Sequence, residues 1–160
     1  MADEIRLSPG DKAPQFKLTN QDGIVTKLAD YKGQWVVLYF YPKDDTPGCT
    51  TEACEFTDNF KQFEKLNAMV LGVSPDKEET HRKFIAKYKI NFNLLSDPDK
   101  LVLQQYGAFG TKKMYGKVTK GVIRSTFLID PKGKIAQVWY NVKAKGHAAR
   151  VMEELSDLTV

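Results

Sequence analysis

Seven consecutive apolar or aromatic residues, from Trp35 to Tyr41, constrain the fold of this chain more than any other feature. The run is rich in β-branched and aromatic side chains, and it lacks the alternation of apolar and polar positions that marks a half-exposed strand. It therefore predicts a central β-strand that is buried on both faces of a sheet. Pro42 follows immediately, and the predicted strand ends there.

Helix-like and strand-like segments alternate along the rest of the chain. Apolar residues at near-helical spacing predict helices at Thr50 to Leu66, Lys77 to Tyr88, Pro98 to Tyr106 and His147 to Leu158. Further strands are predicted at Ala68 to Ser74, Val122 to Ile129 and Ile135 to Tyr140, the last two joined by a tight turn at Asp130–Gly133. This order indicates an α/β fold with a mixed central sheet flanked by helices on both faces, and it is similar to the thioredoxin fold.

The size and charge of the chain set limits on its organisation and partners. Its 160 residues are 42% hydrophobic and 28% charged, with no internal repeat or Pro/Gly/Ser-rich linker, which predicts a single domain over residues 1–160. The 24 basic and 20 acidic residues leave a formal net charge of +4, a balance that favours no particular partner. Because no basic segment leads into an apolar stretch and no apolar run could span a bilayer, we expect a cytoplasmic protein without a membrane segment.

The chain has only two cysteines, Cys49 and Cys54. Two cysteines cannot build the dense disulfide framework of a small secreted domain. In a reducing compartment, a pair this close in sequence favours a chemical role over a structural one.

The segment from Tyr41 to Cys54 lies at the carboxyl end of the predicted central strand, where open α/β sheets usually place their sites. With Thr46 as the N-cap, Pro47 takes the first helical position, where its missing N–H does no harm. Cys49 then lies in the first turn and faces the positive end of the helix. An unperturbed cysteine, with a pKa of roughly 8.5, is mostly protonated at neutral pH, so the free helix amides would favour the nucleophilic thiolate.

The charges near this thiol in sequence are mixed. Three carboxylates, those of Asp44, Asp45 and Glu52, oppose formation of the thiolate, so a nearby cation is expected. Lys43 is close in sequence, whereas Arg124 adjoins a predicted strand and could be delivered by the fold. A guanidinium offers several directed donors in a fixed geometry, which suits arginine better than lysine for stabilising an anion.

Cys54 follows Cys49 by five residues, and this spacing bears on any disulfide between them. In an ideal helix, Cα atoms five positions apart are separated by about 8.7 Å, whereas a disulfide needs Cα atoms within about 7 Å. If both cysteines occupy one helix, they cannot bond until its first turns unwind. The threonines and the glycine at the start of this helix would ease that opening.

The segment from Pro42 to Cys49 resembles the P-x-x-x-T-x-x-C signature of the peroxiredoxins. Cys54 matches the resolving position of the bacterioferritin comigratory protein (PrxQ) subfamily. The likeness covers nearly the whole chain, and it includes the segments Gly10–Phe16, Leu95–Asp97 and Gly121–Asp130. It implies an antioxidant thiol peroxidase with a thioredoxin-like fold, without cofactor or metal, that acts on hydrogen peroxide or organic hydroperoxides.

The resemblance also implies a role for each matching residue. Cys49 would be the peroxidatic cysteine, oxidised to a sulfenic acid. Cys54 would resolve this acid as an intramolecular disulfide, which thioredoxin or a similar dithiol protein reduces. Thr46 would hydrogen-bond the peroxide, Arg124 would stabilise the thiolate and the substrate, and Pro42 would shield the site from water. An intramolecular partner makes a second subunit unnecessary for resolution, which favours a monomer.

Two positions depart from the family pattern. Phe109 stands where relatives often carry Trp, and Thr57 stands where they often carry Arg. Neither lies in the signature, so these departures concern local packing and contacts with the reductant.

Other interpretations of the same residues stay open at this point. Buried free cysteines are commonly inert, and Cys54 also fits the apolar face of its helix. His81 and His147 lack the short ligand spacing of a zinc site. A disulfide reductase would suit the fold, but such enzymes use a C-x-x-C pair, which is missing. The lysines at 112, 113, 117 and 120, with Tyr115 among them, could suggest nucleic-acid binding, although a solvated loop is expected there.

Overall fold

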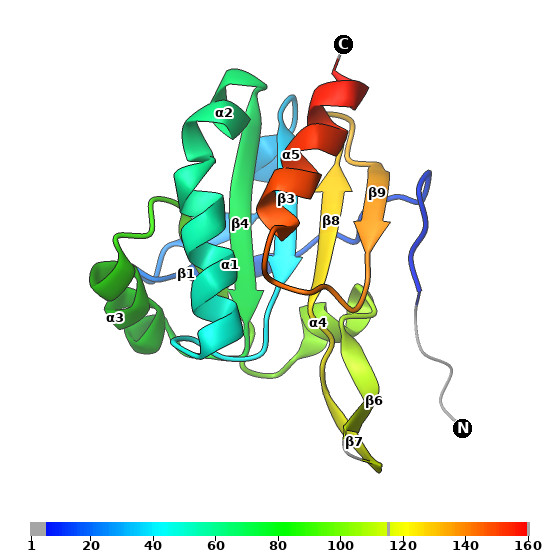
Figure 1. Ribbon diagram of the computed structural model, residues 1–160. Helices are drawn as coiled ribbons and strands as arrows, with labels where there is room; N and C mark the ends of the chain where they lie inside the picture. Colours follow the sequence, from blue (N-terminus) through cyan, green and yellow to red (C-terminus); the bar gives the residue numbers. More distant parts are fainter. Residues whose placement is uncertain (1–5, 115, 160) are drawn as a thin grey trace.

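The computed structural model describes residues 6–114 and 116–159, which include a seven-stranded sheet covered by helices (Figure 1). In spatial order the strands are β2 (Val25–Lys27), β1 (Lys17–Asn20), β5 (Asn93–Ser96), β4 (Ala68–Ser74), β3 (Trp35–Phe40), β8 (Ser125–Ile129) and β9 (Ile135–Trp139). β3 pairs in parallel with β4 and antiparallel with β8. The predicted α/β class with a mixed sheet is therefore confirmed.

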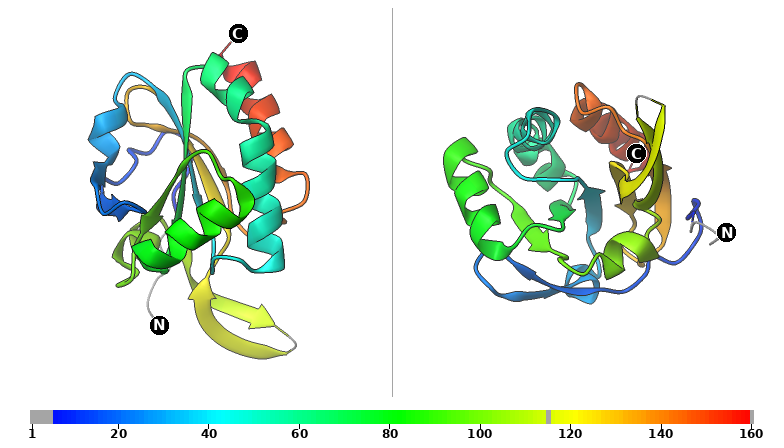
Figure 2. Two further views of the ribbon diagram at one scale, coloured as in Figure 1. Left: turned by 90° about the vertical axis from the view of Figure 1, so that its left-hand side faces the viewer. Right: turned by 90° about the horizontal axis from the view of Figure 1, so that it is seen from below.

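The central strand β3 is buried on both faces, as the unbroken apolar run predicts. Every residue from Val36 to Phe40 is at most 1% exposed. Val37 and Tyr39 pack beneath the helices of one face, which are α1 (Pro47–Asp58), α2 (Phe60–Lys65), α3 (Glu78–Tyr88) and α5 (His147–Leu158). Figure 2 shows α4 (Leu101–Gln105) on the opposite face, where it shares a second core with the 3-10 helix η1 (Leu28–Tyr31).

The carboxyl end of β3 is where several elements meet. α1 begins there, and a separate two-stranded ribbon of β6 (Phe109–Met114) and β7 (Lys117–Val122) projects from the same end (Figure 1). After β7 the chain enters β8, whose first residue Ser125 pairs with Phe40, the last residue of β3. This register carries Arg124 just past the end of β3, towards the start of α1.

Several predicted elements have nearly the expected bounds. β4 and α5 match the predicted ranges, and α3 begins one residue later than predicted. The single helix predicted from Thr50 to Leu66 is wrong in detail, because the structure has two helices. α1 already begins at Pro47, and Asn59 separates it from α2. The Asn59 side chain donates to the backbone oxygen of Glu55 at 2.8 Å, a local hydrogen bond of the kind that competes with helix continuation.

The loop predicted around the lysine-rich segment is also wrong. β6 and β7 pair from Phe109 with Val122 to Met114 with Lys117, so this segment is a hairpin, and Tyr115 lies outside the described residues. The strand predicted from Val122 starts only at Ser125, because Val122 ends β7. The helix predicted from Pro98 is limited to α4, since Lys100 just before it adopts a left-handed conformation with φ of 62°.

Three strands at one side of the sheet, β1, β2 and β5, were not predicted from the sequence. Each is only three or four residues long, too short for a hydrophobic period to be read. No helix in the described ranges combines the length and the apolar character that a membrane span requires.

Candidate active site

Cys49 occupies the third position of α1, at the carboxyl end of β3. Thr46 precedes the helix in an extended conformation, and Pro47 takes the first helical position, as expected. The Thr46 hydroxyl makes no capping bond and instead donates to the backbone oxygen of Lys43 at 2.9 Å. The Cys49 side chain is buried, with the residue 1% exposed, and its thiol is free. Because Cys49 is the third residue of α1, its thiol lies in the first turn, where the unpaired helix amides create a positive potential.

Arg124 supplies the cation at this thiol. Its Nη2 donates to Cys49 Sγ at 3.3 Å, and its Nη1 donates to Glu52 Oε1 at 2.6 Å. The backbone around Arg124 is fixed, because Ile123 N donates to Ala108 O and Val142 N donates to Arg124 O. One guanidinium thus binds two side chains on the same turn of α1, and a lysine could not present this directed fork.

The Arg124–Glu52 pair is strongly buried, with side chains 16% and 0% exposed. Burial raises the pKa of Glu52 to about 7, although the charge and hydrogen bond of Arg124 oppose that rise. Glu52 Oε2 has no hydrogen-bond partner within the described part of the chain, so the buried carboxyl is compensated through Oε1 alone. For Arg124, burial lowers the pKa of the guanidinium, but Glu52 and Cys49 together outweigh this effect, so the net shift is upward.

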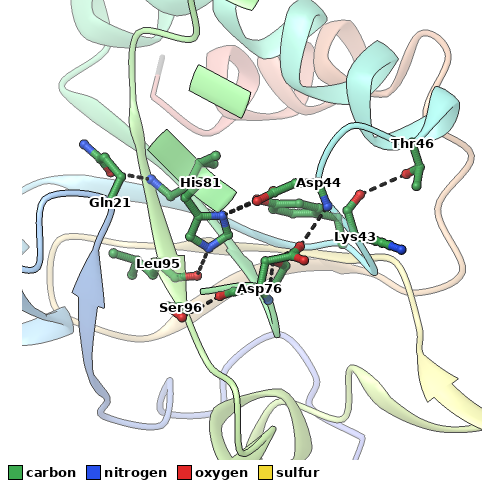
Figure 3. A network of polar contacts seen from close by, with 11 residues as sticks. Gln21, Lys43, Asp44, Thr46, Asp76, His81, Leu95 and Ser96 are labelled. Atoms are coloured by element: carbon green, nitrogen blue, oxygen red, sulfur yellow. Dashed lines mark hydrogen bonds and ion pairs between the residues drawn. The ribbon is translucent and has the colours of Figure 1, made fainter. Parts of the chain in front are cut away.

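The other two carboxylates that oppose the thiolate also have basic partners. Asp44 Oδ2 lies 2.7 Å from Nδ1 of His81, on α3 (Figure 3). Asp45 accepts hydrogen bonds from Lys87 Nζ at 2.8 Å and from Tyr88 Oη at 2.7 Å. Each carboxylate of this segment thus has a basic partner. These carboxylates therefore oppose formation of the thiolate less than the sequence alone indicates.

Cys54 lies on α1 as well, five residues after Cys49, and it is half-buried with a free thiol. Burial raises the pKa of the Cys54 thiol, and the charge of Asp58 raises it further. Both cysteines therefore occupy one continuous helix, the arrangement in which an ideal geometry keeps their Cα atoms too far apart for a disulfide.

Pro42 follows β3 directly and is half-buried at the start of the loop to α1. The structure thus brings Pro42, Thr46, Cys49 and Arg124 to one end of the sheet. His81 and His147 have different hydrogen-bond partners. His147 Nε2 lies 2.8 Å from Thr126 Oγ1, whereas His81 Nδ1 contacts Asp44.

Comparison with known proteins decides the family. Residues 9–138 match the AhpC/TSA family. The chain is 46% identical over 155 residues to peroxiredoxin Bcp of Bacillus subtilis, covering 97% of this chain and 99% of that protein. It is 44% identical over 151 residues to peroxiredoxin Bcp of Escherichia coli, covering 94% and 97%. The chain is a peroxiredoxin of the Bcp/PrxQ subfamily. The solved bacterioferritin comigratory protein of Xanthomonas campestris matches this peroxiredoxin with a TM-score of 0.88 at 39% identity, covering 99% of this chain and 100% of that one.

The family assignment confirms the predicted thioredoxin-like fold and the predicted peroxidase class. It does not favour the disulfide reductase or the nucleic-acid-binding module that the sequence left open. At the two atypical positions of this peroxiredoxin, the Lys100 ammonium lies 5.6 Å from the Phe109 ring centroid. The Thr57 hydroxyl is buried without a partner among the described residues.

The sequence did not reveal two parts of the site. Glu52 was counted only as a charge against the thiolate, although its position three residues after Cys49 puts both on one helix face, a signal that could have identified it. His81 was considered only as a zinc ligand. Its approach to Asp44 depends on how α3 packs beside the loop, and no local pattern indicates it.

Proposed function

We propose that Cys49 is the peroxidatic cysteine and Cys54 the resolving cysteine of an atypical two-cysteine cycle. The observation that carries this proposal is the 3.3 Å contact between Arg124 Nη2 and Cys49 Sγ in the first turn of α1. A helix N-terminus and a directed guanidinium both favour the thiolate, which is the nucleophilic form.

In the first step, the Cys49 thiolate attacks one oxygen of the hydroperoxide. A sulfur–oxygen bond forms as the O–O bond breaks, and the departing alkoxide or hydroxide takes a proton and leaves as an alcohol or water. Arg124 donates hydrogen bonds to the substrate oxygens and stabilises the developing negative charge. The Thr46 hydroxyl turns from Lys43 O to the bound peroxide, and Pro42 keeps water from the thiolate. Cys49 is left as a sulfenic acid.

In the second step, the thiolate of Cys54 attacks the sulfur of the sulfenic acid, forming a disulfide and releasing hydroxide, which is protonated to water. Because both cysteines lie on α1, the first turns of this helix unwind before the sulfurs meet. A dithiol protein such as thioredoxin then reduces the disulfide with two electrons, as suits a cytoplasmic protein.

The substrates in this proposal are hydrogen peroxide and organic hydroperoxides. Support for the organic class comes from the Xanthomonas campestris relative, whose structure is described in terms of alkyl peroxide reduction activity. Since both sulfurs come from one chain, the cycle needs no second subunit, and we propose that the monomer is the active unit.

Intact mass after one equivalent of hydrogen peroxide tests the two sulfur roles. The wild type should lose two hydrogens, Cys54→Ser should gain one oxygen, and Cys49→Ser should stay unchanged. If Cys49→Ser still consumed peroxide in the presence of a dithiol reductant, the assignment would be wrong. If Cys54→Ser turned over as fast as the wild type with thioredoxin, Cys54 would not be the resolving cysteine.

A further inference from the structure

We propose that Asp44 and His81 act as a positioning pair that fixes the loop between β3 and α1, and with it the peroxide-binding side of the site. The inference rests on the proposed role of Cys49. Neither residue touches Cys49 in the contacts described above, so the effect would pass through the loop, which carries Pro42 and Thr46.

The pair is completely buried. Figure 3 shows the hydrogen bonds that connect it to its surroundings. His81 Nδ1 lies 2.7 Å from Asp44 Oδ2, and the two side chains are 0% and 1% exposed. Tyr41 Oη donates to Asp44 Oδ1 at 2.6 Å. The second ring nitrogen of His81, Nε2, lies 3.0 Å from the backbone oxygen of Leu95. Each polar atom of the pair therefore has a partner in protein.

These contacts fix the number of protons that the pair holds. The Leu95 oxygen can only accept, so His81 Nε2 carries a hydrogen. Asp44 Oδ1 accepts the hydrogen of Tyr41. The separate contact between His81 Nδ1 and Asp44 Oδ2 is a hydrogen bond as well, so it holds one further proton. Whether that proton resides on nitrogen or oxygen, the pair as a whole is neutral. It joins α3 to the loop without adding net charge near the thiolate.

The backbone of Asp44 is held as well. Its N–H donates to Asp76 Oδ2 at 2.8 Å, and the same oxygen accepts from Ser74 Oγ at 2.8 Å. Asp44 is thus attached to α3 through its side chain and, through its backbone, to the turn that follows β4. The Thr46 hydroxyl donates to the backbone oxygen of Lys43, so the loop folds back on itself around Asp44.

Stability is a weak explanation for retaining this buried pair. A buried ion pair is commonly no more stabilising than apolar side chains of equal volume, whereas a completely satisfied polar network specifies one geometry. The neighbouring contact of Asp45 with Lys87 is of a different kind. Its side chains are 41% and 57% exposed, where ion pairs contribute little. The buried pair, together with the Asp44 N–H bond to Asp76, is therefore what fixes the loop in place.

A metal ion does not offer a better account of this cluster. The ligand atoms of Asp44, Asp76 and His81 lie within 4.8 Å of one another. However, both ring nitrogens of His81 are engaged by Asp44 and Leu95, and Asp76 Oδ2 accepts two hydrogen bonds. The observed arrangement is a closed hydrogen-bond network.

The test compares two reactions of one thiol. In a Cys54→Ser background, Cys49 is the only cysteine, and its rate constants for oxidation by hydrogen peroxide and for alkylation by iodoacetamide are measured separately. Alkylation needs the thiolate but not the peroxide-binding groups of the loop. Asp44→Ala and His81→Leu should lower the ratio of oxidation to alkylation rates at least tenfold. A change in the amount of thiolate alone would alter both rates together and leave the ratio unchanged, and circular dichroism verifies that each variant compared is folded.

Asp44→Asn is the conservative variant that should rescue the ratio to within threefold of the parent. Its amide can accept from Tyr41 and donate to a neutral His81, so every hydrogen bond is kept. Asp45→Asn is the matched control on the same loop and should change the ratio less than twofold. If circular dichroism shows Asp44→Ala to be unfolded, Tyr41→Phe replaces it, with an expected two- to fivefold fall.

An unchanged ratio in Asp44→Ala, or in Tyr41→Phe where that variant stands in, would overturn the positioning role. So would an Asp44→Asn variant that loses as much as Asp44→Ala. The failure of the proposed function looks different, because there Cys49→Ser itself would still consume peroxide.

Discussion

Arg124 Nη2 lies 3.3 Å from Cys49 Sγ, although 75 residues separate the two in sequence. The antiparallel pairing of β8 with β3 produces this contact, because it carries Arg124 just past the end of the central strand. The thiol thus faces two sources of positive potential, the start of α1 and a guanidinium that is itself oriented by Glu52.

Arg124→Lys should slow the oxidation of Cys49 by hydrogen peroxide by roughly 10²- to 10³-fold, the effect typical of losing a directed donor to a developing oxyanion. The lysine keeps the charge but cannot donate to Glu52 and Cys49 at once. Stopped-flow tryptophan fluorescence can follow the reaction. Arg150→Lys, on the exposed side of α5, is the control and should behave as the wild type. Retention of more than a tenth of the wild-type rate in Arg124→Lys would contradict the role of the guanidinium.

Gly48→Ala should separate stability from activity. A Cβ at Gly48 would lie 3.1 Å from Arg124 Nη2, so the guanidinium would have to shift by a few tenths of an ångström. Alanine is the better helix former, by at most about 1 kcal/mol. We therefore expect an unchanged or higher unfolding midpoint together with an oxidation rate about tenfold lower. A variant with a lower midpoint and an unaffected rate would show that the close approach has no influence on the site.

Glu52→Gln should change how stability depends on pH. The pKa of Glu52 is about 7 in the folded protein, whereas its ordinary value of 4.5 applies to the unfolded chain. Between these pH values the folded state holds a proton that the unfolded state releases. Stability from this group therefore falls as the pH rises from about 4.5 to 7, by on the order of 3 kcal/mol. Glutamine does not titrate, so the free energy of unfolding of Glu52→Gln minus that of the wild type should increase from pH 5 to pH 8.

Urea unfolding at these two pH values provides the measurement. Glu79→Gln is the control, because that carboxylate is 70% exposed on α3 and its removal should give nearly the same difference at both pH values. A constant difference for Glu52→Gln would mean that its carboxyl titrates as in the unfolded chain.

Thr51→Ala should slow disulfide closure without slowing oxidation. Thr51 is exposed on α1 between the two cysteines, and alanine raises helix propensity by about 0.5 kcal/mol. The unwinding proposed for the second step would then be roughly twofold rarer. Quenched mass spectrometry can follow the sulfenic acid and the disulfide separately. Thr80→Ala, at an exposed position of α3, is the matched control, and equal slowing in both variants would argue against unwinding of α1.

The elements that could be predicted are those whose residues carry a long, consistent pattern. β3 follows from seven apolar residues, and α5 from an amphipathic segment twelve residues long. β1, β2 and β5 could not be predicted because strands of three or four residues are stabilised by their neighbours rather than by a pattern of their own. The β6–β7 ribbon escaped prediction because β7 is exposed from Lys117 to Lys120 and shows no apolar alternation there, and backbone pairing with β6 is enough to form it.

The site divides in the same way. Thr46, Pro47 and Cys49 lie in one short segment, so local helix chemistry was enough to place the thiol in a first turn. The partners of the nearby carboxylates depend on long-range packing. His81 reaches Asp44 only because α3 lies against the loop, and a charge count along the chain cannot distinguish a paired carboxylate from a free one.

Both cysteines sit on α1, and on the proposed cycle this one helix has two opposed tasks. Intact, it activates the peroxidatic sulfur. Unwound, it lets the second sulfur arrive. Anything that makes the helix more rigid prolongs the life of the sulfenic acid and so gives a second peroxide time to convert it to the irreversible sulfinic form. A more stable α1 would therefore make the enzyme more sensitive to inactivation by excess peroxide. Engineering for thermal stability would have to take this opposing effect into account.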